Sequence, residues 1–139
     1  MRAVVVGMGV QGKKRKSILG KKFIYSVDKF IKSDFKKLSD VPISHYDTVF
    51  ACVPDNEKIK IIKYCIENKK HILIEKPILY KNNNIFKKLE LKAKKNKVIC
   101  YTAYNHRFEP IIMKMMKLLK SKKLGKIYKC KMFYGNGTS

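Results

Sequence analysis

The sequence predicts an α/β protein in which helices cover both faces of a doubly wound parallel sheet. Short β-branched runs alternate with segments of helical periodicity along most of its 139 residues. The first run, Ala3–Val6, is apolar throughout, as in strands that are buried on both faces. A glycine-rich segment follows it at once, at residues 7–12. With 45% hydrophobic residues, a chain of this length can bury a substantial core.

The individual elements follow from apolar periodicity and from the turn residues between them. The segment Lys29–Ser44 keeps no clear period and stays unassigned. We expect strands at Ala3–Val6, Phe23–Val27, Thr48–Val53, His71–Ile74 and Val98–Tyr101. We expect helices at Val10–Leu19, ended by Gly20, and at Asn84–Lys95. A further helix should follow Pro54, with Asp55 or Asn56 as its cap. Its apolar face would consist of Ile59, Ile62, Cys65 and Ile66.

The pattern changes after the last of these strands. Pro110 suits the first turn of a helix. Ile127–Tyr134 then alternates apolar and charged residues, which predicts a half-buried strand. No later segment could pair with it, and a lone strand does not make a stable sheet. We therefore expect a truncated N-terminal piece of a longer protein, with one domain at 1–103 and the first helix and strand of an α+β second domain at 104–139.

The strongly basic composition suggests nucleic acid but does not establish it. The chain has 33 Lys and Arg against 10 Asp and Glu, a net charge of +23, and such a charge attracts phosphates. However, Arg2, Arg15 and Arg107 are its only arginines, and Arg supplies most base-edge and bidentate phosphate contacts. The lysines are spread along the whole chain, so we interpret the charge as a solvated surface and expect no specific nucleic-acid partner.

Other compositional features argue against membrane and metal functions. No apolar run approaches the ~18 residues of a membrane span, so no membrane partner is expected. The cysteines form no C-x-x-C pair and have no His pair nearby, so we expect no metal and reduced thiols in the cytoplasm. They are Cys52, Cys65, Cys100 and Cys130.

The glycine-rich segment has the spacing Gly7-x-Gly9-x-x-Gly12, which alone is a weak signal. Its position between a buried strand and a helix is the one that a Rossmann-type dinucleotide-binding fold requires. In such a loop Gly7 permits the tight turn, Gly9 lets the backbone approach the pyrophosphate, and Gly12 allows close packing of helix on strand. Val10 and Gln11 open the helix whose free N–H groups would bind the phosphates.

A carboxylate supports the same interpretation. Asp28 lies 21 residues after Gly7, at the end of the second strand, where it could accept hydrogen bonds from the ribose hydroxyls of NAD. It would repel the 2′-phosphate of NADP, although Lys29 could offset the repulsion, so NADP stays possible. Further neighbours of the cofactor are expected where the third strand ends, since ligands lie beyond the carboxyl ends of such strands. They are Cys52, Val53, Pro54 and Asn56.

The segment Glu75-Lys76-Pro77 comes directly after a buried strand, at the same edge of the sheet. The proline biases Lys76 towards an extended conformation. A lysine beside a nicotinamide ring could hold or accept the proton of a substrate hydroxyl, so Lys76 is the candidate catalytic residue. A surface ion pair of Glu75 and Lys76 is the simpler alternative in such a lysine-rich chain.

These motifs together resemble the N-terminal region of the glucose–fructose oxidoreductase and inositol dehydrogenase family (Gfo/Idh/MocA). The resemblance implies a Rossmann domain over 1–103 and a substrate domain that often forms homo-oligomers. It also implies that Lys76 contacts substrate, that Glu75 lies beside the nicotinamide ribose, and that Asn105 and Arg107 lie near the nicotinamide. The matching motifs are Gly7-x-Gly9-x-x-Gly12, Asp28, Val53-Pro54, Lys70-His71-x-x-x-Glu75-Lys76-Pro77 and Tyr104-Asn105-His106-Arg107-Phe108.

The chain departs from the family pattern at several points. Many members have Thr-Pro where this chain has Val53-Pro54, and a His where it has Glu57-Lys58. The family's second-domain Asp/His motif would lie beyond Ser139. The leading hypothesis is the NAD(P)-binding part of an oxidoreductase that acts on a sugar, sugar-nucleotide or cyclitol, inactive as this piece alone. A non-catalytic dinucleotide-binding or regulatory module is the second hypothesis, and a basic nucleic-acid-binding protein is the third.

Overall fold

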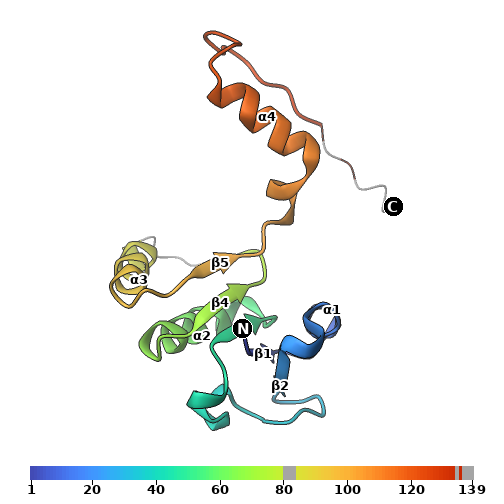
Figure 1. Cartoon of the computed structure of the whole chain (residues 1–139), viewed down its shortest axis with the longest axis vertical. Helices are drawn as coiled ribbons and strands as arrows, with labels where there is room; N and C mark the ends of the chain where they lie inside the picture. Colours follow the sequence, from blue (N-terminus) through green and yellow to red (C-terminus); the bar gives the residue numbers. More distant parts are fainter. Residues whose placement is uncertain (80–83, 134, 136–139) are drawn as a thin grey trace. The chain divides into compact units, whose positions relative to one another are not determined.

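The computed structural model describes residues 1–79, 84–133 and 135. The chain divides into two compact units, Met1–Tyr104 and Asn105–Ser139. In the first unit five strands form a parallel sheet in the order β2-β1-β3-β4-β5; α-helices make three of the four connections, and an irregular segment joins β2 to β3 (Figure 1). The strands are β1 (Ala3–Val6), β2 (Phe23–Val27), β3 (Thr48–Ala51), β4 (His71–Ile74) and β5 (Cys100–Thr102), and the helices are α1 (Val10–Leu19), α2 (Asp55–Glu67) and α3 (Asn84–Lys95). The predicted doubly wound parallel α/β fold is confirmed.

The order of the strands reverses beside β1, because the chain adds β2 on one side of β1 and β3 on the other. Beyond β2, Phe35 forms an isolated parallel bridge with Val27. The unassigned segment 29–44 thus contributes a one-residue remnant of an outer strand. With that remnant counted, the order is that of a dinucleotide-binding fold, in which ligands bind at the carboxyl ends of the strands beside the reversal.

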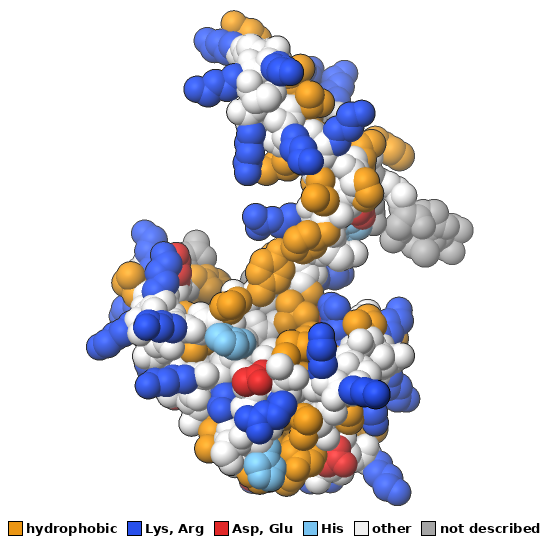
Figure 2. Space-filling model, viewed as in Figure 1, with side chains coloured by type: hydrophobic (Ala, Val, Ile, Leu, Met, Phe, Trp, Pro, Cys, Tyr) orange, Lys and Arg blue, Asp and Glu red, His pale blue; other side chains and the backbone are white. Residues whose placement is uncertain are grey.

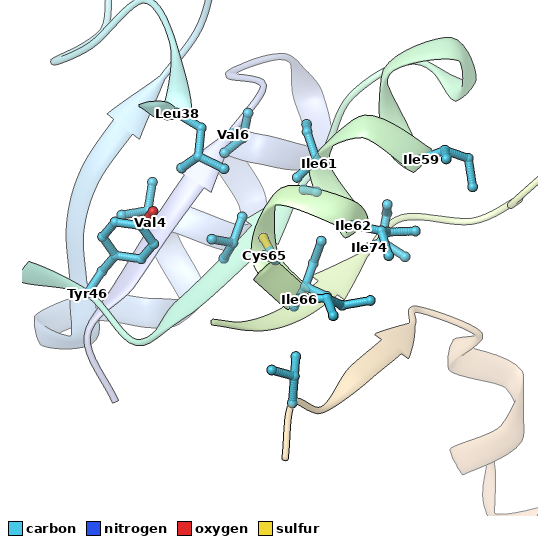
Figure 3. Packing of buried hydrophobic residues seen from close by; sticks show 14 of the residues in the cluster. Val4, Val6, Leu38, Tyr46, Ile59, Ile61, Ile62, Cys65, Ile66 and Ile74 are labelled. Carbon is cyan, nitrogen blue, oxygen red and sulfur yellow. The ribbon is translucent and has the colours of Figure 1, made fainter. Parts of the chain in front are cut away.

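Alternate residues of the strands face two separate apolar layers. On one face Ala3 and Val5 pack with Met8 and with Leu19 of α1. On the other face the larger core gathers apolar residues of α2 and α3, and Cys65 and Ile66 of α2 are among the core side chains labelled in Figure 3. This core includes Val4, Val6, Val49, Ile62, Cys65, Ile66, Ile72, Ile74, Leu89 and Ala93. Burial on both faces explains why β1 is apolar at every position.

Some predicted boundaries differ from the structure. The N-cap of α2 is Pro54, and neither Asp55 nor Asn56 caps the helix with its side chain. Asp55 instead forms an ion pair with Lys58 at 2.6 Å, which takes up the expected capping group. The last strand begins at Cys100, because Val98 packs into the core directly after Lys97, whose φ of 55° breaks the extended chain.

The second unit begins with a 3₁₀-helix at Asn105–Phe108, followed by α4 (Pro110–Lys120) with its proline in the first turn, as predicted. The predicted strand at Ile127–Tyr134 is wrong for the residues that are described, since 127–133 form no regular element. Tyr134 lies outside the described residues. Alternation alone does not make a strand, because its backbone groups need a neighbouring strand, and none of the described residues supplies one here.

Basic side chains are spread over the face of the molecule that Figure 2 shows. Figure 2 shows Lys and Arg side chains scattered over both units, with few acidic groups between them, rather than gathered in one patch on the visible face. This distribution agrees with the interpretation of the charge as a solvated surface. None of the helices in the described ranges has the length and apolar character that crossing a membrane requires.

Candidate cofactor-binding site

Three of the predicted motifs lie in a row at the carboxyl edge of the sheet. The N–H of Gly7 donates to the last carbonyl of β2, that of Cys52 to the last carbonyl of β1, and that of Glu75 to the last carbonyl of β3, at 2.8, 2.7 and 3.0 Å. Each residue therefore continues the hydrogen-bonded ladder by one step after its strand has ended. The sheet register brings the glycine-rich loop, the Cys52 turn and the Glu75 segment side by side.

The three glycines of the loop have different surroundings. Gly7 has a φ of +88°, and a side chain there would meet the carbonyl of Cys52. A Cβ on Gly12 would collide with the carbonyl oxygen of Gly7, so the absence of a side chain lets α1 approach β1. A Cβ on Gly9 would meet nothing within 4 Å. The loop is thus packed beneath Gly7 and Gly12 and open above Gly9, which leaves space for a ligand.

The start of α1 has the properties of an anion-binding site. Gly9 is the N-cap, and no side chain of the described residues caps the helix. The N–H groups of the first turn have no partner within a helix, and the helix dipole adds positive potential there. Gly9, Val10 and Gln11 are exposed. Open space and free donors fit the pyrophosphate of a dinucleotide.

Asp28 lies beside this loop as the sequence predicts. One carboxylate oxygen accepts a hydrogen bond from the N–H of Met8 at 2.7 Å, and the other accepts from Phe30 and Ile31 at 2.8 and 2.9 Å. Burial alone would raise the pKa of Asp28, but these hydrogen bonds and the charge of Lys36 outweigh it and hold the pKa below its ordinary value. Asp28 is therefore a fixed carboxylate whose oxygens keep lone pairs for further donors.

The other predicted neighbours of the cofactor are less directly placed. The ammonium group of Lys29 lies 3.0 Å from Glu57 on α2, so it is engaged in an ion pair. Val53 is half-buried against the core, Pro54 caps α2, and Asn56 is exposed in the first turn of that helix.

Glu75 is joined to the first helix by an ion pair that the sequence interpretation missed. Arg15 donates from Nε to Glu75 Oε1 at 2.7 Å, and a second guanidinium nitrogen lies 2.5 Å from the same oxygen. Both side chains are largely shielded from solvent, with 26% and 15% of their surfaces exposed. Burial, followed by the charge of Glu75, raises the pKa of the nearby Cys52 thiol to about 12. Cys52 is therefore a protonated, unreactive thiol at neutral pH.

Lys76 and Pro77 follow Glu75, are exposed, and are joined by a cis peptide bond. A second missed residue, Lys58 of α2, reaches this segment. Its ammonium group lies 2.5 Å from the carbonyl oxygen of Pro77 and 2.6 Å from Asp55. The sequence did contain a signal for this contact: Lys58 lies on the apolar face of the predicted helix, one turn before Ile62. A lysine at such a position indicates a buried cation that needs a fixed partner.

Asn105 and Arg107 lie in the 3₁₀-helix of the second unit. Their expected place near the nicotinamide stays a prediction.

These features define an NAD-binding Rossmann domain, with a glycine-rich loop at the reversal of strand order and a fixed acid after the second strand. The chain belongs to the Gfo/Idh/MocA family: the sequence model described as "Oxidoreductase family, NAD-binding Rossmann fold" matches residues 20–104. The matched segment begins after the glycine-rich loop. The assignment of that loop therefore depends on its geometry.

Two curated relatives and one solved structure are similar to the chain. The uncharacterized oxidoreductase YrbE of Bacillus subtilis is 29% identical over 69% of this chain and 27% of its own length. Myo-inositol 2-dehydrogenase of Thermotoga maritima is 27% identical over 72% of this chain and 29% of its own. The chain thus spans under a third of these relatives. WlbA dehydrogenase of Bordetella pertussis, solved with NADH and UDP-GlcNAcA, superposes with a TM-score of 0.75 at 16% identity, covering 92% of this chain and 45% of that one.

Proposed function

We propose that this chain is the cofactor-binding portion of a longer oxidoreductase that transfers a hydride between NAD and a hydroxyl or ketone carbon of a sugar, sugar-nucleotide or cyclitol. The row formed by Gly7, Cys52 and Glu75 carries the proposal, because it puts Lys76 at the same edge of the sheet as the glycine-rich loop. The substrate class is inferred from the inositol dehydrogenase of Thermotoga maritima and from WlbA, which was solved with UDP-GlcNAcA.

The cofactor supplies hydride chemistry when bound, and the residues of this chain bind and orient it. The N–H groups at the start of α1 would bind the pyrophosphate over Gly9. Asp28 would accept hydrogen bonds from the adenosine ribose, and its fixed negative charge favours NAD over NADP. Lys29 pairs with Glu57 at 3.0 Å, but this pair is exposed and can open towards a 2′-phosphate, so NADP stays the alternative cofactor.

At the other end of the site, Glu75 would lie beside the nicotinamide ribose, in the conformation that Arg15 fixes. The ammonium group of Lys76 would bind the substrate oxygen and hold or release its proton as the carbon is oxidised or reduced. Asn105 and Arg107 would complete the nicotinamide end of the site. In this proposal the second unit begins the domain that provides the remaining substrate contacts, and the complete protein forms homo-oligomers.

Enzyme assays of the complete protein test this proposal. NAD-dependent oxidation of a panel of inositols, sugars and nucleotide sugars is followed by NADH absorbance, in the wild type and in Lys76→Met. We expect one compound class to be oxidised, and Lys76→Met to lower kcat about 10²–10⁴-fold, the usual contribution of a general acid–base, with unchanged NADH affinity. NADH binding without turnover of any compound would support a non-catalytic dinucleotide-binding module instead.

A further inference from the structure

Lys58 is the one lysine among the described residues that the core encloses, with 3% of its side chain exposed. Burying an ammonium group is costly unless charged or polar partners compensate it. Lys58 has two such partners, the carboxylate of Asp55 and the carbonyl oxygen of Pro77. Most other lysines among the described residues are exposed and can exchange their partners for water, whereas Lys58 is held to these two.

The two contacts of Lys58 differ in what they fix. Asp55 is one turn earlier on the same helix and is 44% exposed, so it neutralises the charge without joining separate parts of the fold. Pro77 is 19 residues away, on the segment that follows β4. The contact with Pro77 therefore ties this segment to α2.

The helix is a rigid support for that contact. On the same stripe as Lys58, the side chains of Ile62, Cys65 and Ile66 are buried in the core (Figure 3). On the other side of the segment, Glu75 is bound to β3 through its N–H and to Arg15 through its carboxylate. Lys76 lies between these two attachment points, with an exposed side chain.

We propose that Lys58 is a positioning residue, which holds Lys76 at the site by binding the carbonyl oxygen of the residue that follows it. The inference deepens the proposed function and rests on the role proposed there for Lys76. Lys58 does not touch substrate or cofactor in this account. It restricts where the backbone of Lys76 can lie, and so where its ammonium group can reach.

The test uses the 139-residue chain and three variants. Lys58→Met keeps the size and removes the donor, Lys58→Arg keeps a cationic donor, and Lys70→Met is the matched control. Lys70 is a suitable control because, like Lys58, it donates hydrogen bonds to backbone carbonyls. Its acceptors are the carbonyls of Ile43 and Tyr46, both at 2.7 Å, and neither belongs to the segment of Lys76. Circular dichroism establishes that each variant is folded, and Lys58→Gln replaces Lys58→Met if the latter does not fold.

Two readouts follow the contact and its consequence without any need for enzyme activity. The ¹³C resonance of the Pro77 carbonyl reports the hydrogen bond, and the rate of acetylation of Lys76 by acetic anhydride, mapped by mass spectrometry, reports its surroundings. We expect Lys58→Met to shift the Pro77 carbonyl resonance and to change the rate of Lys76 acetylation by about threefold or more. This is the size of effect expected when two residues belong to one hydrogen-bonded network. Lys58→Arg should restore both, and Lys70→Met should leave both unchanged.

The proposal is overturned if Lys58→Met leaves the Pro77 resonance and the Lys76 rate as in the wild type, or if Lys70→Met changes them equally. The failure of the proposed function is a separate result, since it would appear as a complete wild-type protein that binds NADH without turning over any compound, or that does not bind NADH.

Discussion

Gly9 and Gly12 belong to one loop, yet a single added methyl group should affect them in opposite ways. At Gly12 the new Cβ would collide with the carbonyl oxygen of Gly7, a backbone atom held in place at the sheet edge. At Gly9 it would enter open space, and the backbone there is extended with a φ of −67°, which any residue adopts. Gly12→Ala should therefore damage the fold, and Gly9→Ala should damage ligand binding.

The sizes of the two effects follow from the geometry. Alanine inside a helix is favoured over glycine by about 0.5–1 kcal/mol. Overpacking in a close-packed region costs about 1–3 kcal/mol, and a collision with backbone lies at the upper end. Gly12→Ala should thus lose a net of about 2–2.5 kcal/mol, or roughly 8–20 °C in Tm for a unit of this size. Gly9→Ala should change stability by less than about 0.5 kcal/mol and weaken NADH binding about tenfold.

Thermal unfolding followed by circular dichroism measures the first effect, and calorimetric titration with NADH measures the second. Each variant is the control of the other, since both add one methyl group to the same loop. A Gly12→Ala protein as stable as the wild type would refute the close packing of α1 on the Gly7 turn. Unchanged NADH affinity in a folded Gly9→Ala protein would refute the pyrophosphate position.

Three further predictions concern charges and thiols at the site. Arg15→Leu leaves Glu75 shielded and unpaired, so it should cost about 1.5–3 kcal/mol in urea unfolding; a loss below about 0.5 kcal/mol would make the ion pair irrelevant to stability. Because its pKa is raised to about 12, Cys52 should react with iodoacetamide far more slowly at pH 8 than Cys130, which is exposed; equal rates measured by mass spectrometry would contradict this. The folded protein lowers the pKa of Asp28 below its ordinary value of 3.8, so the ionised carboxylate stabilises the fold at pH values above 3.8. The wild type should therefore be more stable than Asp28→Asn at pH 7, and this difference should vanish as the pH falls below 3.8. A difference in stability that persists in acid would show that ionisation of Asp28 does not cause it.

Sequence periodicity predicted the first unit well because strand and helix patterns there agree with the turns between them. The start and end of α1 follow from the glycines around it, and the apolar run of β1 follows from burial on both faces. The same reasoning is wrong at 127–133, where alternation predicts a strand and the structure has no regular element. Periodicity describes how side chains could be sorted between two faces, but the pairing of the backbone depends on a neighbour that the local sequence does not contain.

The candidate site was predictable to the extent that it follows the strand ends. Gly9, Asp28 and Glu75 could be placed at one edge because carboxyl ends of parallel strands share that edge. Arg15 and Lys58 could not, because each is an ordinary basic residue in a lysine-rich chain until the register of the sheet is known. Their partners are 60 and 19 residues away, and no local pattern specifies such pairs.

NAD binding at the glycine-rich loop is tested most directly by an NMR titration of the 139-residue chain with NADH. Such a titration detects even millimolar affinity. We predict saturable shifts of the backbone amides of Gly7, Gly9 and Gln11 and of the neighbouring Asp28, with α3 unaffected although three lysines lie in its last turn. Absent shifts in a folded chain, or shifts spread over the lysine-rich surface that vanish with added salt, would contradict the assignment of this loop as the cofactor site.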